Sequence, residues 1–323
     1  MPGIITHNLL AETVIRDLTD DKLKAMIKAN HHAFRLGVNG PDFLYFINSL
    51  PWSDQKVRKS YTALANEIHK THINDFYHLA FKIIKKNNES ENYDKMIAYL
   101  AGHLCHWVLD SITHPFIFYR TNGTTADTKY WHYRYESMID IYMYDHLKSK
   151  QLLNLPSAAL LNHDSLDIDA IAKLYIPIVK EIWSFELDVK TINRAFKDFY
   201  TVLLLSYDPV GIWYHIIRGF ELIKNDEWNF TSHFITNKKD LTRDILNINH
   251  QKWSNPCDCS DVHHESFIEL FDQAHLLGIK TLNELQHAIV TNKDNQLLTI
   301  IDNRSYDTNH REFKSMKYFD PIY

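Results

Sequence analysis

Glycine, proline and cysteine are scarce in this chain of 323 residues, which contains 8 Gly, 9 Pro and 3 Cys. So few turn-forming residues argue against a turn-rich β-sandwich or barrel. Three Cys cannot build a disulfide framework, and their odd number fits a reducing compartment. The single C-x-C pair, Cys257 and Cys259, has no second Cys pair to complete a cysteine-rich metal site, so we interpret it as part of a polar loop.

An excess of positive charge, a secretory leader and a long apolar run are also missing. The formal net charge of −5 gives no electrostatic case for nucleic acid or an anionic membrane surface. The N-terminus, MPGIITHNLLA, has no basic segment followed by a long apolar core, so we expect no signal peptide. The longest apolar run, FYTVLLLSY, is too short for a transmembrane segment. We therefore expect a cytoplasmic protein without a nucleic-acid partner.

The sequence does show helical periodicity, and its 45% apolar and 13% aromatic residues are enough to form a hydrophobic core. Thr6 is a candidate N-cap for a first helix to Asp17, and Gly37 suits a left-handed C-cap. A central helix from about Tyr99 should end at Pro115. Further helices are predicted at 130–150, 168–187, 190–207, 211–225 and 264–289. The prediction is one all-α domain over 1–323, with a motif core at 1–150 and a helical C-terminal extension at about 226–323.

Histidine is unusually frequent, with 20 in the chain, and some of these histidines recur at helical spacing beside carboxylates. His106 and Asp110 lie four residues apart, so a helix places them on one face, with His114 a further turn along. His132 and Glu136 repeat this spacing after a polar loop. A single His/Asp pair is more often a structural hydrogen bond. Two such helices side by side, however, offer the imidazole and carboxylate ligands that zinc accepts.

Two polar residues near these motifs fit a supporting role better. His103 shares the face of the central helix, and we interpret it as a structural histidine. Asp140, one turn after Glu136, is expected to accept a hydrogen bond from His132 or a neighbour.

Five segments in order carry a family resemblance: ITHNLLA, LGVNGPDFLYF, LANEIHKTH, AGHLCHWVLDSITHP and WHYRYESMID. Over about residues 4 to 145 the chain resembles the zinc-dependent phospholipase C family, which includes bacterial phosphatidylcholine-preferring phospholipase C and clostridial alpha-toxin. The resemblance implies a multi-helical domain of the phospholipase C/single-strand nuclease type that binds three zinc ions. By position it implies the metal ligands His7, Asp42, His69, His106, Asp110, His114, His132 and Glu136.

The chain departs from the secreted members of that family at two points. They carry a histidine six residues after the bridging aspartate, where this chain has Phe116, so His114 is the available substitute. They also use an N-terminal tryptophan as a metal ligand, whereas here removal of Met1 would expose Pro2. We therefore expect two zinc ions, and a third only if the Pro2 nitrogen can take the place of that tryptophan.

The predicted function is a zinc-dependent hydrolase of a phosphate ester, either a phospholipid or a small molecule. Asp42 or Glu136 would accept the proton of the attacking water, and the sequence does not choose between them. Two alternatives stay open: a non-catalytic helical scaffold in which structural metals hold the helices together, and a specialised biosynthetic hydrolase that acts on a non-phosphate bond. Single-strand nucleases are the nearest other enzyme class, and the acidic net charge weighs against them.

Overall fold

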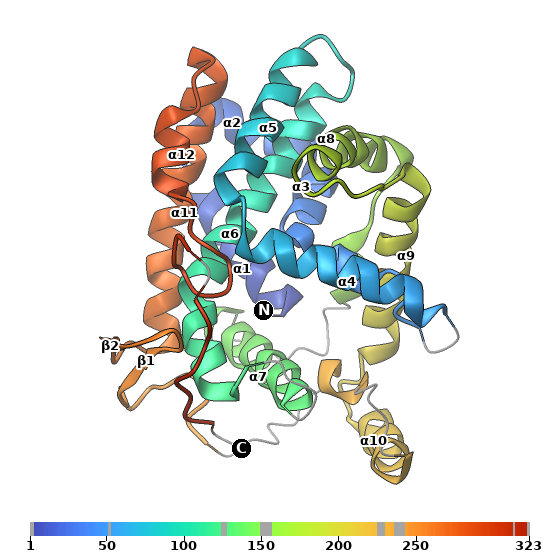
Figure 1. The fold of residues 1–323 in the computed structure, drawn as a ribbon, viewed down its shortest axis with the longest axis vertical. Helices are drawn as coiled ribbons and strands as arrows, with labels where there is room; N and C mark the ends of the chain where they lie inside the picture. The colour runs from blue at the N-terminus through green and yellow to red at the C-terminus, as the bar shows by residue number, and fades with distance from the viewer. Residues whose placement is uncertain are drawn as a thin grey trace.

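A computed structural model describes residues 3–50, 53–123, 128–148, 157–224, 230–235, 243–312 and 314–321. The fold is all-α, as predicted, with one antiparallel hairpin among the described residues (Figure 1). No described helix is long and apolar enough to cross a bilayer. The α-helices are α1 (Ile4–Asp17), α2 (Asp21–Ala29), α3 (His31–Gly37), α4 (Gln55–Lys70), α5 (Ile73–Lys86), α6 (Tyr93–Thr121), α7 (Lys129–Lys148), α8 (Ser165–Trp183), α9 (Val189–Ser206), α10 (Ile212–Lys224), α11 (Phe267–Thr291) and α12 (Asn295–Ile301). The shorter elements are the 3₁₀ helices η1 (Gly40–Phe46), η3 (Ser157–Leu161) and η4 (Phe230–His233) and the strands β1 (Trp253–Asn255) and β2 (Asp258–His263).

Helix α6 runs through the middle of the molecule, and α3 and α11 pack against it (Figure 1). Glycines permit the close crossing of α3 and α6. A Cβ on Gly37 would lie 2.1 Å from the Tyr99 carbonyl oxygen, and one on Gly102 would lie 2.1 Å from the Phe34 carbonyl oxygen. The predicted left-handed cap at Gly37 is wrong, because Gly37 is helical and serves this contact instead.

Pro115 does not end α6, contrary to the prediction. The helix continues to Thr121 and stops at Asn122, whose φ of 58° is left-handed. Pro115 cannot donate a backbone hydrogen bond, but Phe116 and Ile117 directly after it are completely buried. Burial of these side chains, at roughly 1.5–3 kcal/mol each, offsets the lost bond. The continued helix also keeps His114 in line with Asp110.

The first helix begins at Ile4, and Thr6 is not its N-cap, so that prediction is wrong too. Its N-terminus is held instead by Asp140 of α7. The Asp140 carboxylate accepts hydrogen bonds from the backbone N–H groups of Ile5 (3.1 Å) and Thr6 (2.8 Å) and from the Thr6 hydroxyl (2.6 Å). A Cβ on Gly3 would lie 2.1 Å from this carboxylate. Asp140 therefore fixes α1 to α7, and it accepts its hydrogen bonds from α1 and not from the metal-site histidine that was one of its two expected partners.

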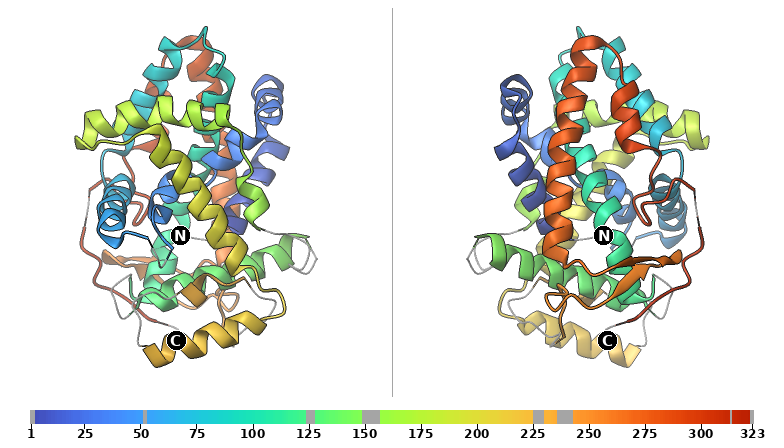
Figure 2. Two further views of the ribbon diagram at one scale, coloured as in Figure 1. Left: turned by 90° about the vertical axis from the view of Figure 1, so that its right-hand side faces the viewer. Right: turned by 90° about the vertical axis from the view of Figure 1, so that its left-hand side faces the viewer.

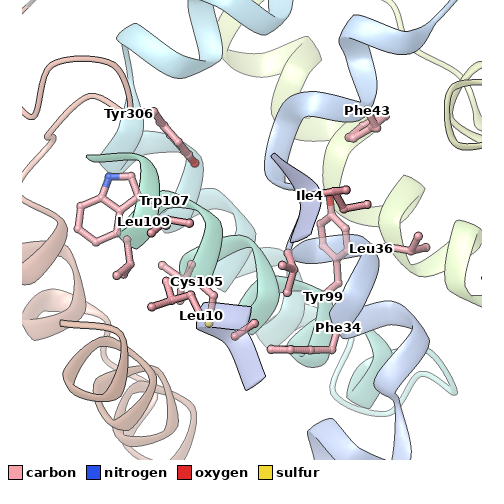
Figure 3. Close-up of a cluster of buried hydrophobic side chains, with 14 of the residues drawn as sticks. Ile4, Leu10, Phe34, Leu36, Phe43, Tyr99, Cys105, Trp107, Leu109 and Tyr306 are labelled. Atoms are coloured by element: carbon pink, nitrogen blue, oxygen red, sulfur yellow. The ribbon is translucent and has the colours of Figure 1, made fainter. Parts of the chain in front are cut away.

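The C-terminal third of the chain joins the same hydrophobic core as the first helices. Helix α11 starts with a capping box of Ser266 and Glu269 and packs on α1 and α6. The hairpin β1–β2 and α12 were not predicted. The residues described beyond α12 form no helix or strand, yet Tyr306 is buried among the same apolar side chains as Trp107 and Leu109 of α6 (Figure 3).

Candidate metal centre

The eight predicted ligands come from five elements around the middle of α6, and all of them are buried. His7 lies on α1, Asp42 on η1 and His69 in the last turn of α4. Helix α6 contributes His106, Asp110 and His114, and α7 contributes His132 and Glu136. The helical spacing placed the residues of α6 and of α7 correctly on shared faces.

Asp110 lies between three histidines, with no exposed surface. Its Oδ1 is 3.2 Å from His7 Nε2 and 3.5 Å from His114 Nε2. Its Oδ2 is 3.0 Å from His106 Nε2. The two carboxylate oxygens thus face different imidazoles, which is the arrangement needed for a carboxylate that bridges two cations.

Asp42 forms a second compact group with His69 and His106. Its Oδ1 is 3.2 Å from His69 Nε2 and 3.6 Å from His106 Nε2. The position of Asp42 beside His106 depends on Gly40. Gly40 has a φ of +50°, and a Cβ added there would lie 2.1 Å from His106 Cδ2. His7, His106 and Asp110, and likewise Asp42, His69 and His106, can each direct ligand atoms that lie within 4.8 Å of one another.

His132 and Glu136 form the third pair, 2.9 Å apart between Nε2 and Oε1. The other ring nitrogen of His132 is 2.9 Å from the Thr121 hydroxyl, which orients the ring. Phe118 stacks on His132 and also contacts His114, at ring-centroid distances of 4.9 and 5.3 Å. The structure therefore places this pair beside His114 but outside the two compact groups.

The potential ligand atoms of the two compact groups and of His114 are buried and make no hydrogen bond. They are His7 Nε2, Asp42 Oδ1, His69 Nε2, His106 Nε2, Asp110 Oδ1 and Oδ2, and His114 Nε2. A buried polar atom left unbonded costs about 1–3 kcal/mol, so such atoms are rare singly and should not gather at one point. A divalent cation would satisfy them together.

In His69, His106 and His114 the opposite ring nitrogen has a partner, whereas Nδ1 of His7 is also without a hydrogen bond. Nδ1 of His69 lies 2.7 Å from the Ala65 carbonyl oxygen, that of His106 lies 3.1 Å from the Val38 carbonyl oxygen, and that of His114 lies 3.0 Å from the Tyr306 carbonyl oxygen. A carbonyl only accepts, so each Nδ1 carries the proton and each Nε2 presents a lone pair to the cluster. Imidazole and carboxylate donors without thiolate fit zinc in a site that keeps room for water.

Burial and neighbouring charges adjust the pKa values of these groups. Burial lowers the pKa of His7, and it lowers the pKa values of His114 and His132 far below the usual range. These imidazoles are therefore neutral at pH 7, the form that binds metal.

The two aspartates of the cluster raise the pKa values of the other two histidines. Burial alone would lower the pKa values of His69 and His106, but Asp42 and Asp110 beside them raise both. Burial opposes the charge of Asp110, yet its histidine neighbours hold the pKa of this carboxyl well below normal. Asp110 is therefore an ionised carboxylate.

Two residues at the site were not predicted from the sequence. The Tyr306 ring packs 5.0 Å from the His69 ring, and its backbone N–H donates to the His69 carbonyl (2.9 Å). Asp307 Oδ1 lies 3.8 Å from His114 Nδ1. The region has no helical period, so nothing in the sequence indicates that it reaches the cluster.

The remaining candidates lie elsewhere. His103 bonds two tyrosines, with Nδ1 2.9 Å from the Tyr77 hydroxyl and Nε2 2.8 Å from the Tyr175 hydroxyl, so it is structural as interpreted. Cys257 and Cys259 are free thiols at the hairpin. Pro2, the possible ligand of a third zinc ion, lies outside the described residues.

The fold and the site together define a helical protein with a buried histidine–carboxylate cluster suited to divalent cations. A sequence model of the family described as zinc-dependent phospholipase C matches residues 6–207. The chain belongs to the zinc-dependent phospholipase C family, a family of metal-dependent hydrolases, and the resemblance noted in the sequence is confirmed. No curated protein and no solved structure matches the chain.

Proposed function

We propose that this protein is a zinc-dependent phosphodiesterase that hydrolyses the phosphodiester of phospholipids in the manner of phospholipase C. The observation that carries the proposal is the convergence of buried, unbonded nitrogen and oxygen atoms on Asp110. Core packing alone gives no reason to bury so many unsatisfied donors and acceptors at one place.

Two zinc ions would be held by these ligands, and Asp110, whose two oxygens face different imidazoles, would contribute to both sites. One group consists of Asp42, His69, His106 and Asp110. The other would draw on His114, His132 and Glu136, and His7, which approaches the same Asp110 Oδ1 as His114, would be available for a third ion. Bound zinc would bind the phosphate and lower the pKa of a water molecule.

The proton of the attacking water needs an acceptor that solvent can reach. The side chains of Asp42 and Glu136 are each 8% exposed, whereas that of Asp110 is not exposed at all. Asp42 and Glu136 are therefore the proposed proton acceptors, and Asp110 serves to bind and position.

The direct test combines metal analysis with cleavage assays on phosphatidylcholine, a soluble chromogenic phosphodiester and single-stranded DNA. Zinc in the purified protein and cleavage of the first two substrates are expected. Asp110→Asn should lose zinc and activity together, whereas Asp320→Asn, an exposed carboxylate paired with Arg120, should keep both. Full activity of Asp110→Asn at trace zinc would refute the proposal.

Two further variants separate the proton acceptors. At saturating zinc, the substitution that removes the acceptor should lower kcat by about 10²-fold or more. Asp42→Asn and Glu136→Gln should therefore differ in kcat once their zinc contents are matched. Stoichiometric zinc without cleavage of any substrate would instead favour the structural scaffold, because the cluster also ties α1, α4, α6 and α7 together.

A further inference from the structure

Helix α10 carries an apolar face that no other described element covers. The side chains of this face, here called the apolar stripe, are between 45% and 82% exposed, and they are Ile212, Trp213, Ile216, Phe220 and Ile223. At about 100° per residue they all fall within an arc of about 100° around the helix axis. In both views of Figure 2, α10 lies across the lower end of the molecule.

The opposite face of α10 is firmly attached to the protein. The Tyr214 hydroxyl is 2.9 Å from that of Tyr130, and the Arg218 guanidinium lies 3.8 Å from the centre of the Tyr130 ring. Glu221 accepts a hydrogen bond from the backbone N–H of Thr231 (3.0 Å). These polar contacts hold one face of α10 against the protein. The apolar stripe, on the opposite face of the helix, therefore points outward.

The attachment also links α10 to the candidate metal centre. Tyr130 lies in the first turn of α7, two residues before His132. The helix thus sits at the end of the molecule from which α7 enters the cluster.

We propose that the apolar stripe of α10 docks the protein on a zwitterionic phospholipid surface. The inference rests on the proposed function, for which it names the source of the substrate. Large apolar side chains with tryptophan and phenylalanine on one face of a helix are typical of helices that lie in the lipid interface.

Size and charge favour lipid over a second copy of the chain. The stripe presents on the order of 500 Å² of apolar surface, short of the roughly 800 Å² per partner that a stable protein interface buries. It contains no charged residue, and the chain has a net charge of −5, so anionic lipid offers no added attraction. Binding should therefore occur on neutral phosphatidylcholine and should not weaken as salt is raised.

The test compares two double variants of the full chain in sedimentation with phosphatidylcholine vesicles. Trp213→Ser with Phe220→Ser removes the aromatic part of the stripe, and we expect at least a tenfold loss of vesicle binding. Leu276→Ser with Val290→Ser makes the same kind of change at exposed positions of α11 and should bind as the wild type does. Zinc content and thermal unfolding check that both variants are folded.

Activity assays separate this inference from the proposed function. The stripe variant should cleave vesicle lipid at least tenfold more slowly and a soluble chromogenic phosphodiester at the wild-type rate. Unchanged vesicle binding by the stripe variant would overturn the docking proposal, as would a wild-type dimer that becomes monomeric in the variant. Stripe-dependent binding without any phosphodiester cleavage would refute the proposed function and leave the docking surface standing.

Discussion

Individual residues of the cluster are held at their places by contacts that the sequence does not display. Spacing alone identified His106 with Asp110 and His132 with Glu136, because helical geometry fixes residues four apart. It could not identify the partners of His103, which shares the face of His106 but bonds tyrosines of α5 and α8. Asp140 was expected to accept a hydrogen bond from His132 or a neighbour, and spacing could not show that its donors lie at the start of α1. Long-range partners of this kind depend on how helices cross, which periodicity does not specify.

Gly40 provides a prediction about the close approach of η1 to α6. In Gly40→Ala the new Cβ would overlap the His106 ring, and φ of +50° disfavours any side chain. We expect a loss of about 2–4 kcal/mol of folding free energy and weaker zinc binding, because His106 must move. Urea unfolding and competition with a chromogenic chelator measure the two effects.

Gly123→Ala is the matched control, since Gly123 also has positive φ (+74°) but no atom of the described residues lies within 4 Å of an added Cβ. It should cost about 1 kcal/mol and leave zinc affinity unchanged. Equal effects of the two substitutions on zinc affinity would contradict the role assigned to Gly40.

At the scale of elements, the strongly periodic helices could be predicted and the irregular segments could not. The predicted ranges at 190–207 and 211–225 match α9 and α10 closely. Strand β1 has three residues, too few for a visible alternation, so the hairpin was missed. The segment after α12 has no periodicity at all, although it provides the carbonyl that orients His114.

The second prediction concerns Asp307, in the irregular segment after α12. Asp307 lies beside the protonated ring nitrogen of His114, and burial raises the pKa of its carboxyl. Asp307→Ala removes a carboxylate 3.8 Å from His114 Nδ1 and should weaken zinc binding by up to about 10-fold, since the Tyr306 carbonyl at 3.0 Å still orients the ring. Titration with a chromogenic chelator measures the affinity, and Asp307→Glu should recover part of it. If Asp307→Ala binds zinc no more weakly than Asp320→Ala, the carboxylate does not position His114.

At the scale of the whole molecule, the cluster joins helices from distant parts of the chain. His7, His69, Asp110 and Glu136 belong to α1, α4, α6 and α7, so a cation bound among them opposes the separation of all four helices. The eight candidate ligands could be proposed before the fold was known because the family resemblance supplied their order along the chain. The contributions of residues 303–308 and of α10 lie beyond the family match at 6–207.

Removal of metal should therefore lower thermal stability. Zinc at about 100 times its dissociation constant adds about 2.7 kcal/mol, and a chain of this size should lose about 4 °C in Tm when a chelator removes it. Scanning calorimetry with and without chelator measures the shift. Asp110→Asn, which lacks the carboxylate proposed to bind both ions, should show little further change on chelation, and a wild-type Tm insensitive to chelator would contradict a bound metal.

The metal-free protein should also reveal the buried histidines through pH. Burial holds the pKa of His132 far below its ordinary value, so below about pH 6.5 the unfolded chain binds a proton there that the folded chain does not. The stabilisation from His132 is thus present at pH 7 and is lost as the pH falls. His132→Gln abolishes this titration, so the stability difference between wild type and variant should shrink by up to about 2 kcal/mol between pH 7 and pH 5. Urea unfolding in chelator at both pH values measures the difference. The raised pKa values of His69 and His106 change stability with pH in the opposite direction, but they do so in both proteins and therefore cancel in this comparison. If the stability difference between wild type and variant grew on acidification, His132 would not be buried as a neutral imidazole.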